Sequence, residues 1–285
     1  MSTTTQSAPT RGTGAPASGA PVRAAADTRI PLRGHLRHIG ALVRRNALQI
    51  KQDPESMFDA VLMPIIFVLL FVFVFGGAIS GKGNQDTYVN YVVPGLMAMM
   101  GMNIAMGVGT GVNDDFKKGV MDRFRSMPIA RSSVLIAKIV VEMGRMVVAT
   151  AILLGMGFLL GLSVHSVPAL LASIGLSMVF GASLMWIFIL LGLTMKTPQA
   201  VQGMAMLVLM PLQFGSSIFA PTSTMPGWLQ SFTDYNPLST LADAARHLLN
   251  GTGPVGHSVL VTLIWSVGIT AVTAPLAVRK FRNKT

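Results

Sequence analysis

The most specific chemical motif in the sequence is an incomplete phosphate-binding loop. Residues 76–83 read GGAISGKG, which has the glycine and lysine spacing of the GxxxxGK[ST] loop of nucleotide-binding proteins. That loop needs a serine or threonine after the lysine, because the hydroxyl binds Mg²⁺, and Gly83 stands there instead. The loop must also follow a β-strand, whereas this stretch follows a long apolar run. We therefore expect no nucleotide-binding site in this chain.

The residues for other enzyme chemistries are missing as well. An intramembrane hydrolase needs two aspartates, a zinc-binding HExxH helix or a Ser/His pair inside its membrane spans. No long apolar run has an aspartate in its core, and the five histidines are scattered along the chain. The sequence predicts no catalytic, cofactor-binding or metal-binding residue, so the chain is not expected to be an enzyme by itself.

Three charged residues lie close to an apolar run. Lys138, Glu142 and Arg145 are spaced i, i+4 and i+7, which places them on one face of a helix. A proton relay or a substrate contact would use such a group. The favoured interpretation is an ion pair at the cytoplasmic base of a helix, with the two basic side chains reaching outward, because a full uncharged run follows at 147–164.

The elements that must position these residues are membrane helices. Hydrophobic residues make up 51% of the 285 residues and charged residues only 12%. Six nearly uncharged runs occupy residues 57–79, 92–112, 147–164, 167–195, 200–219 and 258–278. Each has about 18 residues or more, which as a helix crosses a hydrocarbon core about 30 Å thick. The sequence predicts an all-α, polytopic membrane protein with six transmembrane helices.

The basic residues indicate how these helices are oriented. Segments 1–56, 113–131, 195–199 and 279–285 contain eight, five, one and four Lys or Arg, whereas the alternate segments 80–91, 161–166 and 220–257 contain one, none and one. The positive-inside rule then places both termini in the cytoplasm, with the chain in the inner or plasma membrane. A nucleic-acid partner is not expected, because the basic residues do not gather on one soluble face.

The segment before the first run divides into two parts. Residues 1–30 are rich in Ser, Thr, Ala, Pro and Gly and predict a disordered cytoplasmic tail. Residues 31–53 predict an amphipathic helix in the membrane interface, with a basic face toward anionic lipid headgroups. Its apolar face consists of Leu32, Leu36, Ile39, Val43, Ala47 and Ile50. Asp53-Pro54 ends this helix.

Residues 113–128 predict a short cytoplasmic helix. Asn113 can cap its start, and Asp114 and Asp115 suit the positive end of a helix dipole. One apolar stripe is formed by Phe116, Val120, Phe124 and Met127. Such a stripe needs a cover, and lipid headgroups and the groove of a cytoplasmic partner remain equal alternatives.

Two stretches resemble a known family. The string GVMDRFRSMPIARSSVL resembles the loop after the second span of type-2 ABC exporter permeases, especially the daunorubicin/doxorubicin-resistance group. Its matching residues are Gly119, Asp122, Arg123, Phe124, Arg125, Ser126, Pro128 and Ile129. After the fifth run, the matching residues are Met225, Pro226, Asn236, Pro237, Leu238, Arg246 and Gly251. The resemblance extends from about residue 31 to the end of the chain.

The resemblance implies an architecture and partners. The permease domain would be residues 54–285, working as a homodimer or as a heterodimer with a related permease. Two ATPase subunits, which hold ATP and Mg²⁺, would dock on its cytoplasmic face. Residues 113–128 would be the coupling helix, and residues 221–249 an outer pair of re-entrant helices. The predicted coupling residues are Asp114, Phe116, Val120, Asp122, Arg123, Phe124, Arg125 and Met127.

A substrate path is predicted from polar and thioether side chains in the second and fifth runs. A lone amide side chain in these runs is more stable when it faces an internal path or a dimer interface than when it faces lipid. Thioethers suit varied apolar cargo, although packing between helices is an equal alternative for the methionines. The predicted path residues are Asn103, Met106, Gln202, Met210 and Gln213.

The function expected from the sequence and the resemblance is export. The cargo would be an amphipathic drug, a natural product or a lipid, moved out of the cytoplasm or the inner leaflet by ATP hydrolysis in a separate subunit. An exporter of a polysaccharide or a lipid-linked precursor in the same superfamily is the first alternative. A self-contained secondary transporter is a second alternative, but it would need coupling acids inside the spans.

Overall fold

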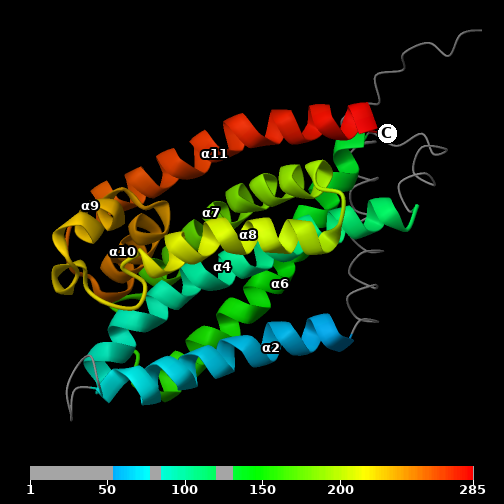
Figure 1. Cartoon of the computed structure of the whole chain (residues 1–285). Coiled ribbons are helices and arrows are strands. Elements are labelled where there is room, and N and C mark those ends of the chain that lie inside the picture. The colour runs from blue at the N-terminus through cyan, green and yellow to red at the C-terminus, as the bar shows by residue number, and fades with distance from the viewer. Residues whose placement is uncertain (1–53, 78–84, 120–130, 285) are drawn as a thin grey trace, which may run out of the picture.

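The chain forms a bundle of long helices with two short helices at one end (Figure 1). The computed structural model describes residues 54–77, 85–119 and 131–284. The elements are α2 (Pro54–Leu69), the π-helix η1 (Leu70–Phe75), α4 (Gln85–Lys117), α6 (Arg131–Leu159), α7 (Val167–Thr194), α8 (Pro198–Phe214), η2 (Thr222–Thr224), α9 (Gly227–Tyr235), α10 (Pro237–Asn250) and α11 (Val255–Lys284). The predicted tail at 1–30 and interfacial helix at 31–53 lie outside the described residues.

Four of these helices are long and apolar enough to cross a membrane. They are Asp86–Lys117, Val134–Leu159, Val167–Thr194 and Val255–Lys284. A shorter apolar helix covers Ala60–Phe75, and α8 has 17 residues. The expectation of an all-helical chain is confirmed for the described residues, which contain no β-strand. The count of six spans stays a prediction.

The third and fifth helices differ in position from the predicted runs. The run expected at 147–164 corresponds to α6, which begins at Arg131 and ends at Leu159, before Gly161 with φ +96°. Lys138, Glu142 and Arg145 therefore lie within a long apolar helix and not at its base. The run expected at 200–219 ends as a helix at Phe214, because the chain turns at Gly215.

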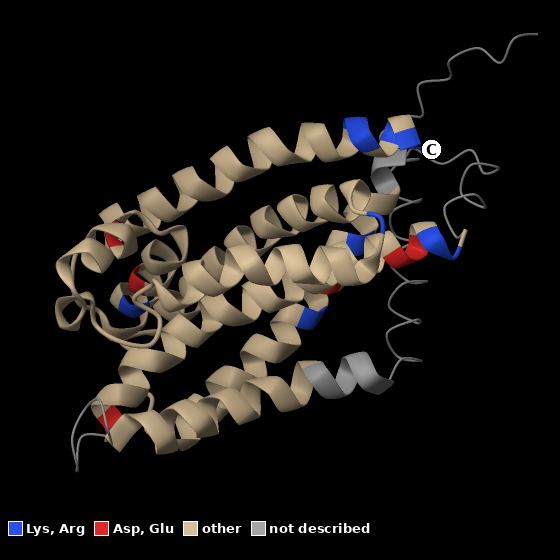
Figure 2. Cartoon of the chain, in the orientation of Figure 1, with Lys and Arg blue, Asp and Glu red and all other residues tan. Residues whose placement is uncertain are grey.

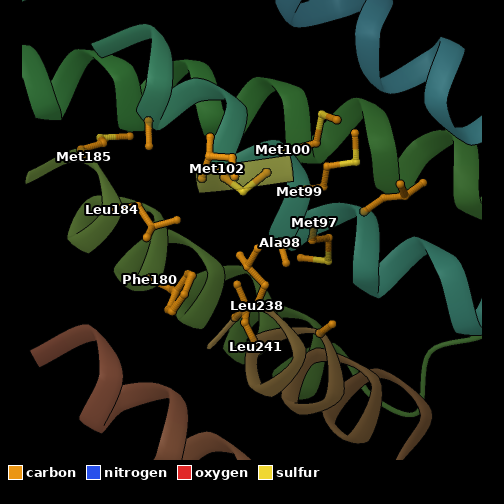
Figure 3. Packing of buried hydrophobic residues seen from close by; sticks show 14 of the residues in the cluster. Met97, Ala98, Met99, Met100, Met102, Phe180, Leu184, Met185, Leu238 and Leu241 are labelled. Carbon is orange, nitrogen blue, oxygen red and sulfur yellow. The ribbon is translucent and has the colours of Figure 1, made fainter. Parts of the chain in front are cut away.

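Helix α4 lies at the centre of the bundle and packs against α6, α7, α8 and α10. Met97 and Met102 on α4 are fully buried, as are Phe180 and Met185 on α7. Figure 3 shows this packing, with Leu238 and Leu241 of α10 closing the same cluster. Several methionines in the second run thus serve the core, where a flexible thioether fills irregular space between helices.

Glycines allow α4 and α7 to approach closely. A Cβ added at Gly192 would collide with the carbonyl oxygen of Gly109, and one at Gly109 would lie 2.5 Å from the carbonyl oxygen of Phe188. Small residues at helix crossings bring backbones into contact in this way, which strengthens packing between membrane helices.

The two ends of the bundle differ in charge. Basic residues gather at the end where the C terminus lies (Figure 2). The last turns of α4 and α11 carry Lys117, Arg282 and Lys284, and Lys196 lies in the turn between α7 and α8. We call this the basic end. The opposite end holds α9 and α10, whose sequences contain Asp234, Asp243 and Arg246.

Candidate functional site

Two adjoining cavities open between α2–η1 and α8, with α4 as their common floor. The first, the Arg145 cavity, has a volume of about 440 Å³ and is lined by α2, α4, α6 and α8. The second, the methionine cavity, has a volume of about 640 Å³ and extends toward the α10 end. Phe67, Asn103 and Met106 line both cavities, so the two adjoin along α4, and together they are called the groove.

All five residues of the predicted substrate path line this groove. Asn103 and Met106 on α4 lie where the two cavities meet. Gln202 on α8 lines the Arg145 cavity, and Met210 and Gln213 line the methionine cavity. The structure therefore brings together side chains from two helices that are about 100 residues apart in sequence. Their role in transport stays a prediction.

The methionine cavity is lined mostly by thioethers and aromatic rings. The thioethers come from Met99, Met102, Met106, Met206, Met210 and Met225, and the phenyl rings from Phe67, Phe71, Phe75, Phe214 and Phe219. Asn103 and Gln213 supply amides. Soft, adaptable apolar walls with a few polar groups suit an amphipathic molecule of variable shape.

Stacked phenylalanines form part of the wall of the methionine cavity. Phe71 in η1 stacks on Phe219, with ring centroids 4.5 Å apart and planes inclined by 13°. Phe71 also stacks on Phe75 at 5.3 Å, and Phe214 lies 5.7 Å from Phe219. The hydroxyl of Tyr88 donates a hydrogen bond to the carbonyl oxygen of Phe219, which holds the loop after α8 against α4.

Arg246 on α10 fixes the same loop. Its guanidinium donates to the carbonyl oxygens of Tyr91, Ser217 and Ile218 at 2.6–3.0 Å, and to the carboxylate of Asp243 at 2.6 Å. It also lies 3.7 Å from the centroid of the Tyr91 ring. A rigid fork with five donors can satisfy several carbonyls at once, which an ammonium cannot do. Arg246 therefore joins α4, α10 and the loop after α8.

The polar residues at the α10 end were largely missed by the sequence reasoning. Arg246 was noted only as a match to a family pattern, and Ser217 and Asp243 were not noted. The signal in the sequence is a single arginine in a short segment beside an apolar run. An arginine that becomes buried there needs polar partners, so its presence could have predicted a polar clamp.

The predicted group of Lys138, Glu142 and Arg145 divides into two ion pairs. Arg145 pairs with Glu142 at 2.9 Å, and both side chains are largely buried. Lys138 pairs instead with Asp115 on α4. The expected ion pair is thus present between Arg145 and Glu142, whereas Lys138 turns to the acid that the neighbouring α4 supplies.

The predicted coupling helix does not begin at Asn113. Helix α4 continues through Asn113, Asp114 and Phe116 to Lys117, and Gly119 follows with φ +67°. A residue in this left-handed conformation commonly ends a helix. Asn113 does not cap a helix start, because its amide donates to the carbonyl oxygens of Gly192 and Met195. Val120, Asp122, Arg123, Phe124, Arg125 and Met127 lie outside the described residues.

The described part of the predicted coupling segment packs on the bundle. Phe116 contacts Phe281 of α11 edge to face, with ring centroids 5.6 Å apart. Asp114 pairs with Lys118 at 2.7 Å, and this hydrogen bond raises the pKa of Lys118 above its ordinary value. Phe116 is therefore covered by α11 and is not an exposed member of an apolar stripe.

Metal chemistry has no visible support in the described residues, which contain no group of three or more His, Cys, Asp or Glu placed to hold a metal ion. The incomplete phosphate-binding loop falls mostly at residues 78–83, outside the described part of the chain. What the described residues offer is a largely apolar groove between helices, with a polar clamp at one end.

Comparison with known proteins identifies relatives over most of the chain. Residues 37–250 match the ABC-2 type transporter family. The chain is 39% identical to a daunorubicin resistance ABC transporter permease protein of Streptomyces coeruleorubidus, over 84% of each sequence. It is 26% identical to a probable doxorubicin resistance ABC transporter permease protein of Mycobacterium tuberculosis, over 82% of this chain and 84% of that protein. A putative transport permease of Cyanophora paradoxa is 23% identical over 80% of this chain.

These matches agree with the architecture. Four helices of membrane-spanning length and composition make the chain a multi-pass membrane protein. The extent of the family match, which includes the groove residues on α4 and α8 and the clamp on α10, decides the classification. The chain belongs to the ABC-2 type transporter family.

Proposed function

We propose that this chain is the permease subunit of an ATP-driven exporter and that its cargo crosses the membrane along the groove between α2–η1, α4 and α8. The cargo is an amphipathic drug, natural product or lipid taken from the cytoplasm or the inner leaflet. ATP and Mg²⁺ bind to a separate ATPase subunit. The names of the two drug-resistance relatives reported above support a drug-like cargo.

The proposed assembly has six spans, both termini in the cytoplasm and two permease chains. The continuous helix from α2 into η1 and the 17-residue α8 support the two additional spans. The basic end supports the cytoplasmic side, since basic residues are retained there. Residues 113–128 transmit ATPase motion, and residues 221–249 form the outer cap, which is supported by the short helices α9 and α10.

The observation that carries the proposal is the lining of the groove. Thioethers and phenyl rings line the methionine cavity, and Asn103, Gln202 and Gln213 place amides along the groove at intervals. Apolar cargo gains from leaving water, and the amides provide orientation through hydrogen bonds. Arg145, which also lines the groove, has its charge paired with Glu142. A path of this kind can bind cargo and still release it.

A single-cysteine experiment tests this path. The chain contains no cysteine, so an introduced thiol is the only one in the protein. Met106→Cys and Met210→Cys are reconstituted in vesicles with a candidate ATPase subunit, and ATP-driven movement of daunorubicin is followed by its fluorescence. A bulky maleimide should stop transport in both variants, because the adduct fills the groove.

The matched control is Val267→Cys on α11, which is 65% exposed and lines neither cavity. Its modification should leave transport unchanged. Full transport after complete labelling at both Met106→Cys and Met210→Cys would refute the path. Daunorubicin movement driven by a proton gradient without ATP would refute the ATPase partnership and favour the secondary-transporter alternative.

A further inference from the structure

We propose that the basic end of the bundle contains a binding site for the headgroup of an anionic phospholipid of the phosphatidylglycerol type. The site is a third cavity of about 650 Å³ between the end of α4, the turn from α7 to α8 and the end of α11, here called the lysine cavity. It shares no lining residue with the Arg145 and methionine cavities. The inference therefore does not depend on the proposed cargo path.

Contacts between the three elements build the walls of the lysine cavity. The amide of Asn113 donates to the carbonyl oxygens of Gly192 and Met195 at 2.8 Å, which ties the end of α4 to the turn after α7. The ammonium of Lys284 donates to the carbonyl oxygen of Leu193 at 3.1 Å and lies 4.9 Å from the centroid of the Phe116 ring. The shape of the cavity is thus set by the fold and does not depend on a ligand.

Among the described residues, the lining of the lysine cavity carries positive charge only. Lys117, Lys196, Lys280 and Lys284 line the cavity, and no described Asp or Glu does. The nearby acids Asp114 and Asp115 are already paired with Lys118 and Lys138. Within the described residues Lys117, Lys196 and Lys280 form no ion pair with an acid. Because like charges held together repel one another, an anion in this cavity would be bound favourably.

Three observations favour a lipid headgroup over a free anion. The cavity lies at the ends of α4, α7 and α11, which are long enough to span a membrane, so it falls at the depth of headgroups. Phe116 and Leu193 give it an apolar side. Above it, α11 exposes Val272 and Leu276, along which acyl chains can lie. Basic pockets between membrane helices at the interface bind anionic lipid headgroups.

An unsatisfied acceptor selects the type of headgroup. Asn113 is 2% exposed, lines the cavity, and its Oδ1 has no hydrogen-bond partner among the described residues. A buried acceptor without a donor is unfavourable. A glycerol headgroup carries hydroxyl donors beside its phosphodiester, so a small rotation of the buried Asn113 amide toward the cavity would let a hydroxyl donate to Oδ1 while the lysines bind the phosphate. The volume of the cavity falls within the range of small-ligand sites.

The test measures lipid binding to the purified full-length chain. Binding of phosphatidylglycerol and phosphatidylethanolamine is compared by native mass spectrometry in detergent, for the wild type and for Lys196→Gln/Lys280→Gln. Each basic residue near an anionic headgroup is worth roughly a five-fold factor, so the double variant should bind phosphatidylglycerol at least about ten-fold less. Phosphatidylethanolamine binding should not change.

Adjacent residues on α11 provide a control of equal charge. Lys280 lines the cavity and Arg279 does not, and both side chains are exposed. Lys280→Gln should lower phosphatidylglycerol binding, whereas Arg279→Gln should not, and Lys280→Arg should retain it. Equal loss in Lys280→Gln and Arg279→Gln would overturn the site, because general surface charge would then explain the binding.

Two further experiments distinguish a lipid headgroup from the other possible occupants of the cavity, a free anion and the ATPase subunit. Inorganic phosphate should not displace phosphatidylglycerol at equal concentration, and displacement would reduce the site to a free-anion site. The double variant should also co-purify with the ATPase subunit as the wild type does. Loss of the ATPase with full retention of phosphatidylglycerol would assign the lysine cavity to protein contact and overturn the lipid proposal. Neither result depends on transport activity.

Discussion

At the scale of single residues, Arg246 connects parts of the chain that lie far apart in sequence. The carbonyl of Tyr91, which it binds, lies 155 positions away, and those of Ser217 and Ile218 lie 29 and 28 positions away. The side chain is buried, and the Ser217 carbonyl that it binds also accepts a hydrogen bond from the Tyr91 hydroxyl at 2.6 Å. Loss of Arg246 would remove a buried donor from all three carbonyls and the paired charge from Asp243.

We predict that Arg246→Lys destabilises the fold. An ammonium cannot reach the Tyr91 carbonyl and the 217–218 carbonyls together, and a buried acceptor left unpaired, as the Ile218 carbonyl would be, costs about 1–3 kcal/mol. The midpoint of thermal unfolding in detergent should fall by roughly 5 °C. Arg279→Lys, at an exposed position on α11, is the control and should melt like the wild type. Equal midpoints for all three proteins would show that the clamp contributes little.

The sequence predicted the groove residues better than it predicted the clamp. Asn103, Gln202 and Gln213 stood out because an amide inside an apolar run is rare, and all three line the groove. Methionines could not be assigned in this way, because Met97 in the core and Met106 in the groove have the same local surroundings in sequence. Only the packing of α7 and α10 against α4 separates them.

At the scale of elements, helix boundaries were the weakest part of the sequence interpretation. Asn113-Asp114-Asp115 has the residues of a helix start, and these same residues form the last turns of α4. The competing signals were Lys117 and Gly119, which are typical of a helix end. Tertiary contacts decided the outcome, because Asn113 binds the turn after α7 and Phe116 packs on α11.

The spacing of glycines on α4 does not identify the face that meets α7. Gly107 and Gly111 have the spacing of a helix-contact motif, yet Gly107 lines the Arg145 cavity and would accept a Cβ without any neighbour within 4 Å. Gly109 and Gly192 form the close contact instead. Which face of a helix meets a neighbour cannot be read from glycine spacing when glycines occupy several faces.

We predict that Gly192→Ala and Gly175→Ala, two identical changes on α7, have different effects. A Cβ at residue 192 collides with the backbone of Gly109, and overpacking of this kind costs about 1–3 kcal/mol. A Cβ at residue 175 has no neighbour within 4 Å, so the change should be neutral or stabilise the helix by about 0.5–1 kcal/mol. Thermal unfolding of both variants in detergent measures the difference, and similar midpoints would contradict the close contact.

At the scale of the whole molecule, the two ends of the bundle differ in charge, and this difference indicates how the bundle is oriented in the membrane. The basic end collects the C terminus, the end of α4 and the turn after α7 (Figure 2). A chain that begins α2 at this end and finishes α11 there crosses the bundle an even number of times. This agrees with the orientation expected from the basic residues and does not decide which side faces the cytoplasm.

We predict the sidedness from the positive-inside rule. Reporter fusions after residues 85, 165 and 235 should report the outside, and fusions after residues 125, 197 and 284 the inside. Among the described residues, 85, 165 and 235 lie at one end of the bundle and 197 and 284 at the basic end, so each of these fusions tests the crossing before it. An inside report at residue 235 would refute both the six-span topology and the outer cap formed by α9 and α10.

The π-helical turn at η1 allows one part of the first long helix to rotate relative to the other. A π-helix holds one residue more per turn than an α-helix, and such turns occur often at functional sites. If the turn relaxed to α geometry, each residue beyond it would rotate by about 100° around the helix axis. Phe71 lies within this turn and stacks on Phe219. A shift of the helix by one residue would therefore separate the Phe71 ring from the Phe219 ring. Helix α2, on the other side of the turn, would keep its position.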